Sequence, residues 1–203
     1  MLENFGSTYS VTDGTPGSPE VTSDTVSYLF ARYGGCTFNG GLYRVHTADS
    51  SRRACTMLAE AFPEFSFPLI PFGFDWLGRQ FILDLRTKDT DPEIMMLEPG
   101  TGYALEIPRK FSSYHDDELV RDPEPSILPG FFGEWRRANP ADLAFNECVG
   151  YKVPLFLGGE DSLDNLELSD LEVYWSLMGQ LRIATQGLAP GTRIDGVDIR
   201  DGI

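Results

Sequence analysis

Three strand-like segments follow one another in the middle of the chain, and they limit the possible folds more than any other feature. They are RQFILDLR (79–86), EIMMLEP (93–99) and GYALEIP (102–108). The first alternates apolar and polar residues with the period of a β-strand, and only Gly100-Thr101-Gly102 separates the other two. Consecutive strands with such short links predict an antiparallel meander.

Helical patterns lie on both sides of this meander. Before it, TSDTVSYLFARYGG predicts a helix that begins at Thr22 or Ser23 and stops at Gly34-Gly35, and a second helix is expected from Asp49 or Ser50 to Pro63. After it, FSSYHDDELV (111–120) and SILPGFFGEWRRANP (126–140) read as helical, the latter interrupted by Pro129-Gly130. We therefore predict an α+β fold: a single domain with an antiparallel or mixed β-sheet packed by helices on its N- and C-terminal sides.

Local signals add detail at both ends of the domain. Asn39-Gly40-Gly41 predicts a turn between two short extended pieces. VPLFL (153–157) is expected to be a buried strand that ends at Gly158-Gly159. Ser169-Asp170-Leu171-Glu172 has the pattern of a capping box, with Leu168 and Val173 as a hydrophobic staple. The helix that follows carries apolar residues at helical spacing: Leu171, Tyr174, Trp175, Met178 and Leu181.

The two chain ends differ from the middle in composition. Residues 1–20 are rich in Gly, Ser, Thr and Pro and hold few apolar residues, which predicts a flexible arm or a strap along a sheet edge. The expected organisation is therefore an N-terminal arm (1–20), one α+β domain (21–190) and a C-terminal tail (191–203).

The charge of the chain excludes some partners. With 16 basic and 31 acidic residues the net charge is 16 − 31 = −15. Because nucleic acids and membrane surfaces carry negative charge, neither is an expected partner. The chain shows no apolar run of membrane-spanning length and no signal-like N-terminus, so we expect a cytoplasmic protein. Its three cysteines are odd in number and widely spaced, which favours a reducing compartment over a disulfide framework or a zinc cluster.

Motifs for catalysis or cofactor binding are weak in this sequence. His46 lies near serines and Asp49, and Cys36 precedes it by ten residues, but no nucleophile-elbow motif accompanies them. A structural role for His46 and Cys36 is the stronger interpretation. The segment Glu160–Asp170 holds five carboxylate side chains and the amide of Asn165, yet it lacks the central glycine of a calcium loop. We therefore expect no metal, no cofactor and no enzymatic activity, and we expect the three tryptophans to pack in the core.

One segment resembles a known family. Residues 143–181 resemble the C-terminal domain of type VI secretion DNase-immunity proteins; their sequence is LAFNECVGYKVPLFLGGEDSLDNLELSDLEVYWSLMGQL. The sequences of that family in turn resemble the SUKH superfamily of cell-wall synthesis regulator-like immunity proteins. PFGFDWLGRQFILDL and IPRKFSSYHDDELV are similar to further segments of that family. In one departure, Tyr174-Trp175 stands where many relatives carry a histidine. The residues that carry the resemblance are Glu147, Tyr151, Pro154, Leu155, Leu157, Gly158, Gly159, Asn165 and Leu166.

The resemblance implies a non-enzymatic cytoplasmic protein that binds a cognate toxin and blocks its active site. A nuclease toxin needs cationic residues to hold phosphates, and clustered carboxylates favour fast association with such a site. A small-ligand-binding or regulatory module of the same fold, without a toxin partner, is the alternative. The candidate partner-binding residues are Asp116, Asp117, Glu118, Glu160, Asp161, Asp164 and Glu167.

Overall fold

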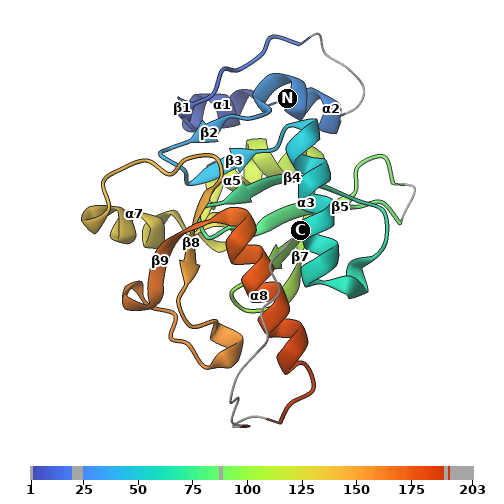
Figure 1. Cartoon of the computed structure of the whole chain (residues 1–203). Helices are drawn as coiled ribbons and strands as arrows, with labels where there is room; N and C mark the ends of the chain where they lie inside the picture. Colours follow the sequence, from blue (N-terminus) through green and yellow to red (C-terminus); the bar gives the residue numbers. More distant parts are fainter. Residues whose placement is uncertain (1, 20–24, 87–88, 190–191, 193–203) are drawn as a thin grey trace.

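A sheet of seven antiparallel strands, paired in sequence order, forms the centre of the protein (Figure 1). The computed structural model describes residues 2–19, 25–86, 89–189 and 192. The three predicted strands are confirmed as β5 to β7, and four shorter or less obvious strands precede them. The strands are β1 (Val11–Asp13), β2 (Thr37–Phe38), β3 (Tyr43–Val45), β4 (Leu69–Asp75), β5 (Gln80–Asp84), β6 (Glu93–Glu98) and β7 (Tyr103–Lys110).

Each face of this sheet carries its own hydrophobic cluster. Because side chains alternate along a strand, neighbours such as Met95 and Met96 in β6 enter different clusters. The first cluster contains Phe72 and Phe81, and the second contains Phe74 and Ile82. Helices cover both faces, so the predicted α+β class is confirmed.

The helices divide between the two faces. α3 (Ala48–Ala61) and α8 (Leu171–Thr185) lie side by side over the second cluster (Figure 1). The first cluster is covered by the shorter helical segments. These are α1 (Glu3–Thr8), α2 (Thr25–Tyr33), α4 (Phe111–Ser113), the π-helical turn η2 (Tyr114–Glu118), α5 (Leu119–Arg121), α6 (Glu124–Ile127) and α7 (Pro129–Ala138). A separate hairpin of β8 (Glu147–Tyr151) and β9 (Leu166–Asp170) leads into α8, and η1 (Pro63–Phe65), η3 (Leu155–Leu157) and η4 (Leu163–Asn165) are single 3-10 turns.

The N-terminal segment is packed, in contrast to the expected flexible arm. Phe5 on α1 is completely buried, and the Tyr9 hydroxyl donates to the Leu119 carbonyl at 2.6 Å. β1 adds to the edge of the sheet by pairing with β2, which matches the alternative of an edge strap. The aromatic residues explain the difference, because their burial offsets the ordering entropy of a segment that is otherwise poor in apolar residues.

Some predicted boundaries fall outside the described residues. The start of the helix at Thr22 or Ser23 lies there, as does the tail 191–203 except for Thr192. The end of that helix is confirmed, since α2 stops at Tyr33 before Gly34-Gly35. The turn at Asn39-Gly40-Gly41 is also confirmed between β2 and β3.

α3 begins slightly earlier than its predicted start. Thr47 is its N-cap residue and accepts a hydrogen bond from the Ser50 backbone at 3.0 Å, while the Ser50 hydroxyl accepts one from the Thr47 backbone at 2.9 Å. This reciprocal pair satisfies two backbone donors that a helix start leaves without partners. The helix ends at Ala61 before Pro63, as predicted.

The strand predicted at 153–157 is wrong. Leu155–Leu157 form the 3-10 turn η3, and the strand of this region is β8, six residues earlier. Pro154 has no backbone N–H to donate to a strand ladder. The Asn165 side chain also holds both backbone groups of Val153, at 3.0 and 2.8 Å, so they do not bond to a neighbouring strand.

The helix predicted after residue 170 is confirmed as α8, but its start differs from the prediction. Asp170 is the N-cap residue and accepts from the backbone N–H of Glu172 and Val173 at 3.0 and 3.1 Å. Ser169 pairs with Cys148 in the β8–β9 ladder, so the predicted capping box does not form. Leu168 and Val173 are both exposed and form no staple.

The segments after β7 are helical as predicted. Residues 111–121 form α4, η2 and α5 in continuity, and the second segment breaks at Leu128, which has a φ of 49°. The break arises because a residue before proline avoids the helical conformation. The tryptophans Trp76, Trp135 and Trp175 lie in the two clusters, which confirms their predicted role. Among the described residues, no helix is both long and apolar enough to cross a membrane.

Candidate functional site

The predicted acidic residues of the C-terminal third lie on the β8–β9 hairpin, three on its loop and Glu167 on β9. Glu160, Asp161, Asp164 and Glu167 are all exposed. The loop is well fixed, because the Tyr151 hydroxyl donates to the Asp161 carboxylate at 2.6 Å and Lys152 Nζ donates to the Asp164 carbonyl at 2.7 Å. These four carboxylates therefore form one ordered acidic surface, here called the hairpin surface.

Exposed apolar side chains also lie on the β8–β9 hairpin. Leu168, on β9, is 54% exposed, and Val153 and Leu163 of the same hairpin are also exposed. Exposed apolar residues surrounded by charged ones are typical of protein interfaces. The hairpin thus carries both negative charge and exposed apolar surface.

The other predicted group, Asp116, Asp117 and Glu118, lies on η2 and serves contacts within the chain. The Asp116 carboxylate accepts from the Phe5 backbone at 3.1 Å and so holds α1 in place. Asp117 pairs with Arg121 at 3.2 Å, and Glu118 pairs with Arg109 at 2.5 Å.

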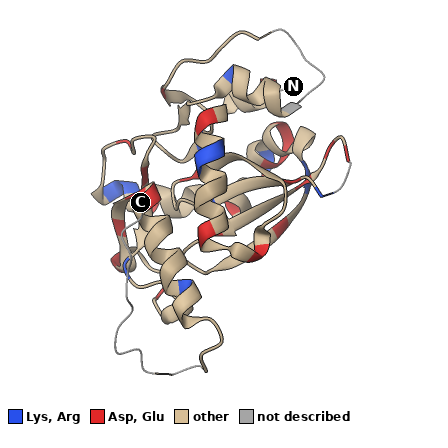
Figure 2. Cartoon of the chain, turned by 45° about the vertical axis from the view of Figure 1, so that its right-hand side comes forward, with Lys and Arg blue, Asp and Glu red and all other residues tan. Residues whose placement is uncertain are grey.

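The two predicted groups do not come together as one site. η2 packs against α1, α4 and α5, whereas the hairpin packs against α8. Acidic residues are spread over several further elements, so charge by itself does not single out one face (Figure 2).

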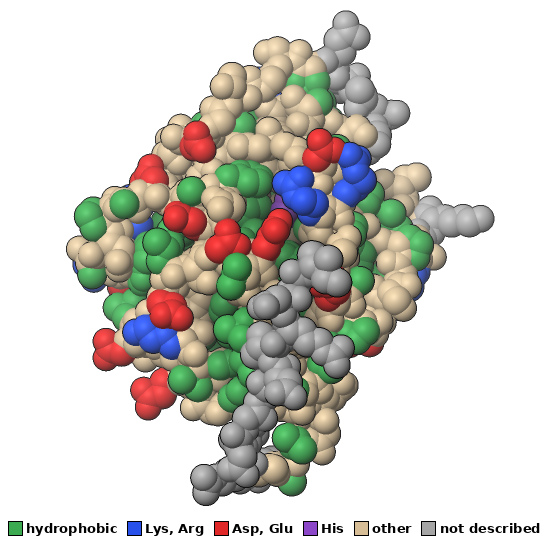
Figure 3. Space-filling view, in the orientation of Figure 1, with side chains coloured by type: hydrophobic (Ala, Val, Ile, Leu, Met, Phe, Trp, Pro, Cys, Tyr) green, Lys and Arg blue, Asp and Glu red, His purple; other side chains and the backbone are tan. Residues whose placement is uncertain are grey.

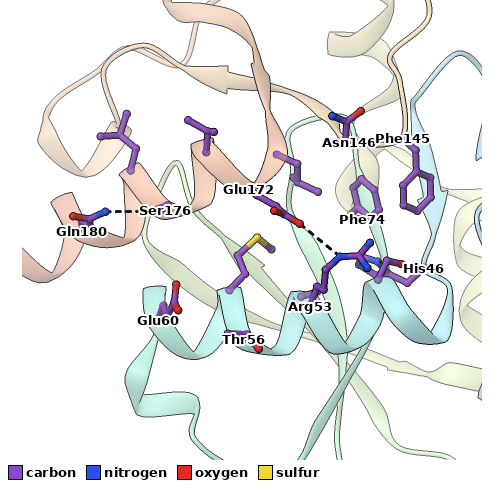
Figure 4. Close-up of a pocket in the computed structure, with 16 residues that line it drawn as sticks. His46, Arg53, Thr56, Glu60, Phe74, Phe145, Asn146, Glu172, Ser176 and Gln180 are labelled. Carbon is purple, nitrogen blue, oxygen red and sulfur yellow. Dashed lines mark hydrogen bonds and ion pairs between the residues drawn. The ribbon is translucent and has the colours of Figure 1, made fainter. Parts of the chain in front are cut away.

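A groove between α3 and α8 was not predicted. Its volume is about 730 Å³. The two helices touch where Gly179 meets Ala61: a Cβ on Gly179 would lie 2.6 Å from the Ala61 Cβ. Arg182 links α8 to the C-terminal end of α3, because it donates a hydrogen bond to the Ala61 carbonyl at 3.1 Å and forms an ion pair with Glu64. At the other end the helices are linked by the ion pair between Arg53 and Glu172, at 3.7 Å (Figure 4).

The groove has a buried floor and a mixed wall. Its floor contains Phe74, Ala54 and His46, all buried. Hydrophobic side chains gather in the middle of this face of the molecule, and acidic side chains stand around them (Figure 3). The wall and rim are formed by Arg53, Thr56, Met57, Glu60, Phe145, Asn146, Glu172, Val173, Ser176, Leu177 and Gln180.

His46 is held as a neutral structural residue at the floor of the groove. Its Nδ1 and Nε2 atoms lie 2.9 Å from Ser50 Oγ and 2.9 Å from Gln80 Oε1. Burial lowers the pKa of His46 to about 4, and the positive charge of Arg53 acts in the same direction. Asp49, the acidic residue near His46 in the sequence, pairs with Arg52 and not with His46. These contacts match the structural role expected for His46.

His115 and Cys36 also lie in the interior. The His115 Nε2 atom is 3.0 Å from the Tyr43 hydroxyl among the aromatic rings of the first cluster, and burial lowers its pKa to about 3. Burial also raises the pKa of Cys36, which favours the unreactive thiol. Cys36, Cys55 and Cys148 are all free.

The sequence did hold one signal for the groove. α8 is apolar on more than its buried side, because Val173 and Leu177, which line the groove, add to the residues that are buried in the second cluster. A helix that is apolar around most of its circumference either is buried on all sides or exposes an apolar face that another molecule can cover.

Comparisons with known proteins give two findings. Part of the chain matches a family model, and most of the chain is similar in fold to a solved structure. Residues 137–182 match the family model described as T6SS immunity protein Tdi1, C-terminal. This match confirms the resemblance to type VI secretion immunity proteins that was inferred for residues 143–181. Within the match lie the β8–β9 hairpin and most of α8, including the groove residues from Phe145 to Gln180.

Across most of its length, the chain is similar in fold to a solved structure from Agrobacterium tumefaciens, titled crystal structure of Atu4351. The two chains are 16% identical, the similarity covers 89% of each, and the TM-score is 0.55. No curated protein matches the sequence.

Proposed function

We propose that this protein is a cytoplasmic immunity protein that binds and neutralises a cognate antibacterial toxin. The observation that carries the proposal is the match of residues 137–182 to a type VI secretion immunity family, since the exposed hairpin surface lies inside the matched segment. The protein acts by binding and catalyses no reaction.

The charge of the hairpin surface suits a basic, nuclease-type toxin. A nuclease holds the phosphates of its substrate with cationic side chains, and the carboxylates of Glu160, Asp161, Asp164 and Glu167 match such a site. The net charge of −15 steers a basic partner toward the protein and speeds their association. Occupation of the phosphate-binding site then excludes the substrate. In this mechanism Asp116, Asp117 and Glu118 add to the negative field.

Co-expression with the product of the neighbouring gene tests the proposal. Cells that express this product as a toxin should grow only when the immunity protein is present, and the two proteins should elute together in size-exclusion chromatography. Absence of both growth rescue and a complex would show that the proposal is wrong.

A charge reversal tests the role of the hairpin surface. We expect the double variant Glu160→Lys/Asp164→Lys to slow association with the toxin by about tenfold or more, because it replaces attraction by repulsion at the contact. Asp122→Lys/Glu134→Lys is the matched control, since both residues are exposed and lie outside the hairpin. Stopped-flow mixing at low salt gives the rates. Equal slowing in both variants would assign the effect to net charge and not to the hairpin.

A further inference from the structure

The two helices that form the groove pack closely at one end and are bridged only by an exposed ion pair at the other. Gly179 allows the close contact with Ala61, and Arg182 bridges α8 to Ala61 and Glu64. At the other end the Arg53 and Glu172 side chains span the gap at 3.7 Å, and Phe74 of β4 and His46, which follows β3, form the floor. The groove therefore has a closely packed end, a loosely bridged end and a buried floor.

The walls of this groove expose apolar surface. Val173 is 62% exposed, and Met57, Phe145 and Leu177 are half-buried around the same space. Burial of apolar surface is favourable because it removes that surface from water. An apolar side chain inserted into the groove would therefore gain by covering these residues.

The charges at the rim indicate what accompanies that side chain. Arg53 and Glu172 are 3.7 Å apart, with side chains that are 66% and 70% exposed, so their pair is weak and easily opened. Glu60, which also lines the groove, is exposed as well, so Glu60 and Glu172 give the rim two carboxylates. The carboxylates outnumber Arg53, so a lysine or arginine beside the inserted residue is the complementary charge.

The groove adjoins the base of the hairpin that carries the hairpin surface. Asp170 is both the last residue of β9 and the N-cap residue of α8. Asn146 ties the two together, because its side chain donates to Asp170 at 3.0 Å and its carbonyl accepts from Leu171 at 2.8 Å. β9, α8 and α3 lie next to one another (Figure 1). A partner that covers about 800 Å², the usual area for one side of a stable interface, can reach both.

We propose that the α3–α8 groove is a second docking site for the toxin, and that it receives an apolar side chain flanked by a lysine or arginine of the toxin surface. This inference rests on the proposed immunity function. The hairpin surface attracts the basic partner, and the groove anchors it. The anchor slows dissociation, whereas the hairpin carboxylates speed association.

Two matched variants of α8 test the groove, with the product of the neighbouring gene as the probe. Val173→Glu places a charge inside the groove, and Ile183→Glu places the same charge on the same helix outside it, at a residue that is 45% exposed. We expect Val173→Glu to raise the Kd at least tenfold, mainly through faster dissociation, and Ile183→Glu to change it less than twofold. Both residues are exposed, so both variants should keep the melting temperature of the wild type within a few degrees.

A second measurement needs no substitution. With methyl-labelled methionine, toxin binding should shift the resonance of Met57, which lines the groove, and should leave that of Met96, buried on the other face of the sheet, unchanged.

The outcomes separate the groove from the immunity function. If the wild type binds the toxin and Val173→Glu binds it equally well with Met57 unshifted, the groove proposal is overturned while the immunity function stands. If the wild type forms no complex, both are overturned. If only a small amphipathic molecule shifts Met57, the groove is a ligand site and its assignment to the toxin is wrong.

Discussion

At the scale of single residues, burial decides which titratable groups are chemically active. Histidine attracts attention because it titrates near neutral pH. In this protein both ring nitrogens of His46 have partners inside the fold, Ser50 and Gln80. The carboxylates of the hairpin surface are the opposite case, since they are exposed. These surface acids, and not the buried histidines, are therefore accessible to a partner.

The buried state of His46 predicts an acid-sensitive fold. Its pKa is about 4 in the folded protein and 6.5 as a free side chain. Between these values the unfolded chain binds a proton that the folded protein does not, so stability is lost as the pH falls. At pH 5 the loss is about 2 kcal/mol, from about 1.4 kcal/mol per pH unit below 6.5.

A comparison with His46→Gln isolates this effect. Urea unfolding at pH 7 and pH 5 should show that the stability advantage of the wild type over His46→Gln shrinks by about 2 kcal/mol at the lower pH. His115 is present in both proteins, so its titration cancels. An advantage that stays constant between the two pH values would contradict a neutral, buried His46.

At the scale of elements, the contact between α3 and α8 determines the shape of the groove. α3 carries Ala61 and α8 carries Gly179 at the point where the helices meet. Small residues at such a point let two helix axes approach closely. Larger residues farther along, Met57 and Leu177, line the groove itself.

Glycine replacement tests this contact. Gly179→Ala should destabilise the protein by about 1–3 kcal/mol, because its Cβ would lie 2.6 Å from that of Ala61, and this overpacking outweighs the helix propensity of alanine. Gly133→Ala on α7 is the control, since a Cβ there meets nothing within 4 Å and should stabilise the fold by up to about 1 kcal/mol. Urea unfolding measures both. Equal stabilisation by the two variants would contradict the close contact.

At the scale of the whole molecule, one sheet unites two hydrophobic clusters. β4, β5 and β6 supply residues to both clusters, for example Phe72 and Phe74 from β4. If these strands unfold, both clusters lose the sheet against which they pack. The single domain 21–190 stays a prediction, and the shared strands are the physical reason to expect one cooperative unit.

The shared strands predict cooperative unfolding. Tryptophan fluorescence reports on both clusters, through Trp76 and Trp175, and far-UV circular dichroism reports on the backbone. Both signals should follow one urea transition with the same midpoint. Two separated midpoints would mean that the clusters unfold as independent units.

The sequence by itself determined the elements whose signals are local. The meander of β5 to β7 followed from alternation and short links, and the stops of α2 and α3 followed from Gly34-Gly35 and Pro63. The family resemblance also arose from a continuous segment. These predictions succeeded because each depends on residues that are close in the chain.

Only the tertiary structure decided the features that need partners far apart in sequence. The aromatic side chain of Phe5 packs beside η2, more than 100 residues away in the sequence. The composition of residues 1–20 does not show this contact, so it led to the prediction of a flexible arm. Asn165 occupies the backbone of Val153 and prevents a strand there. The groove exists because Gly179 meets Ala61 across 118 positions (179 − 61), and no local pattern records which two helices pack together. The negative charge was visible in the sequence, but the fold decided which carboxylates stand exposed beside apolar surface and which hold the chain together.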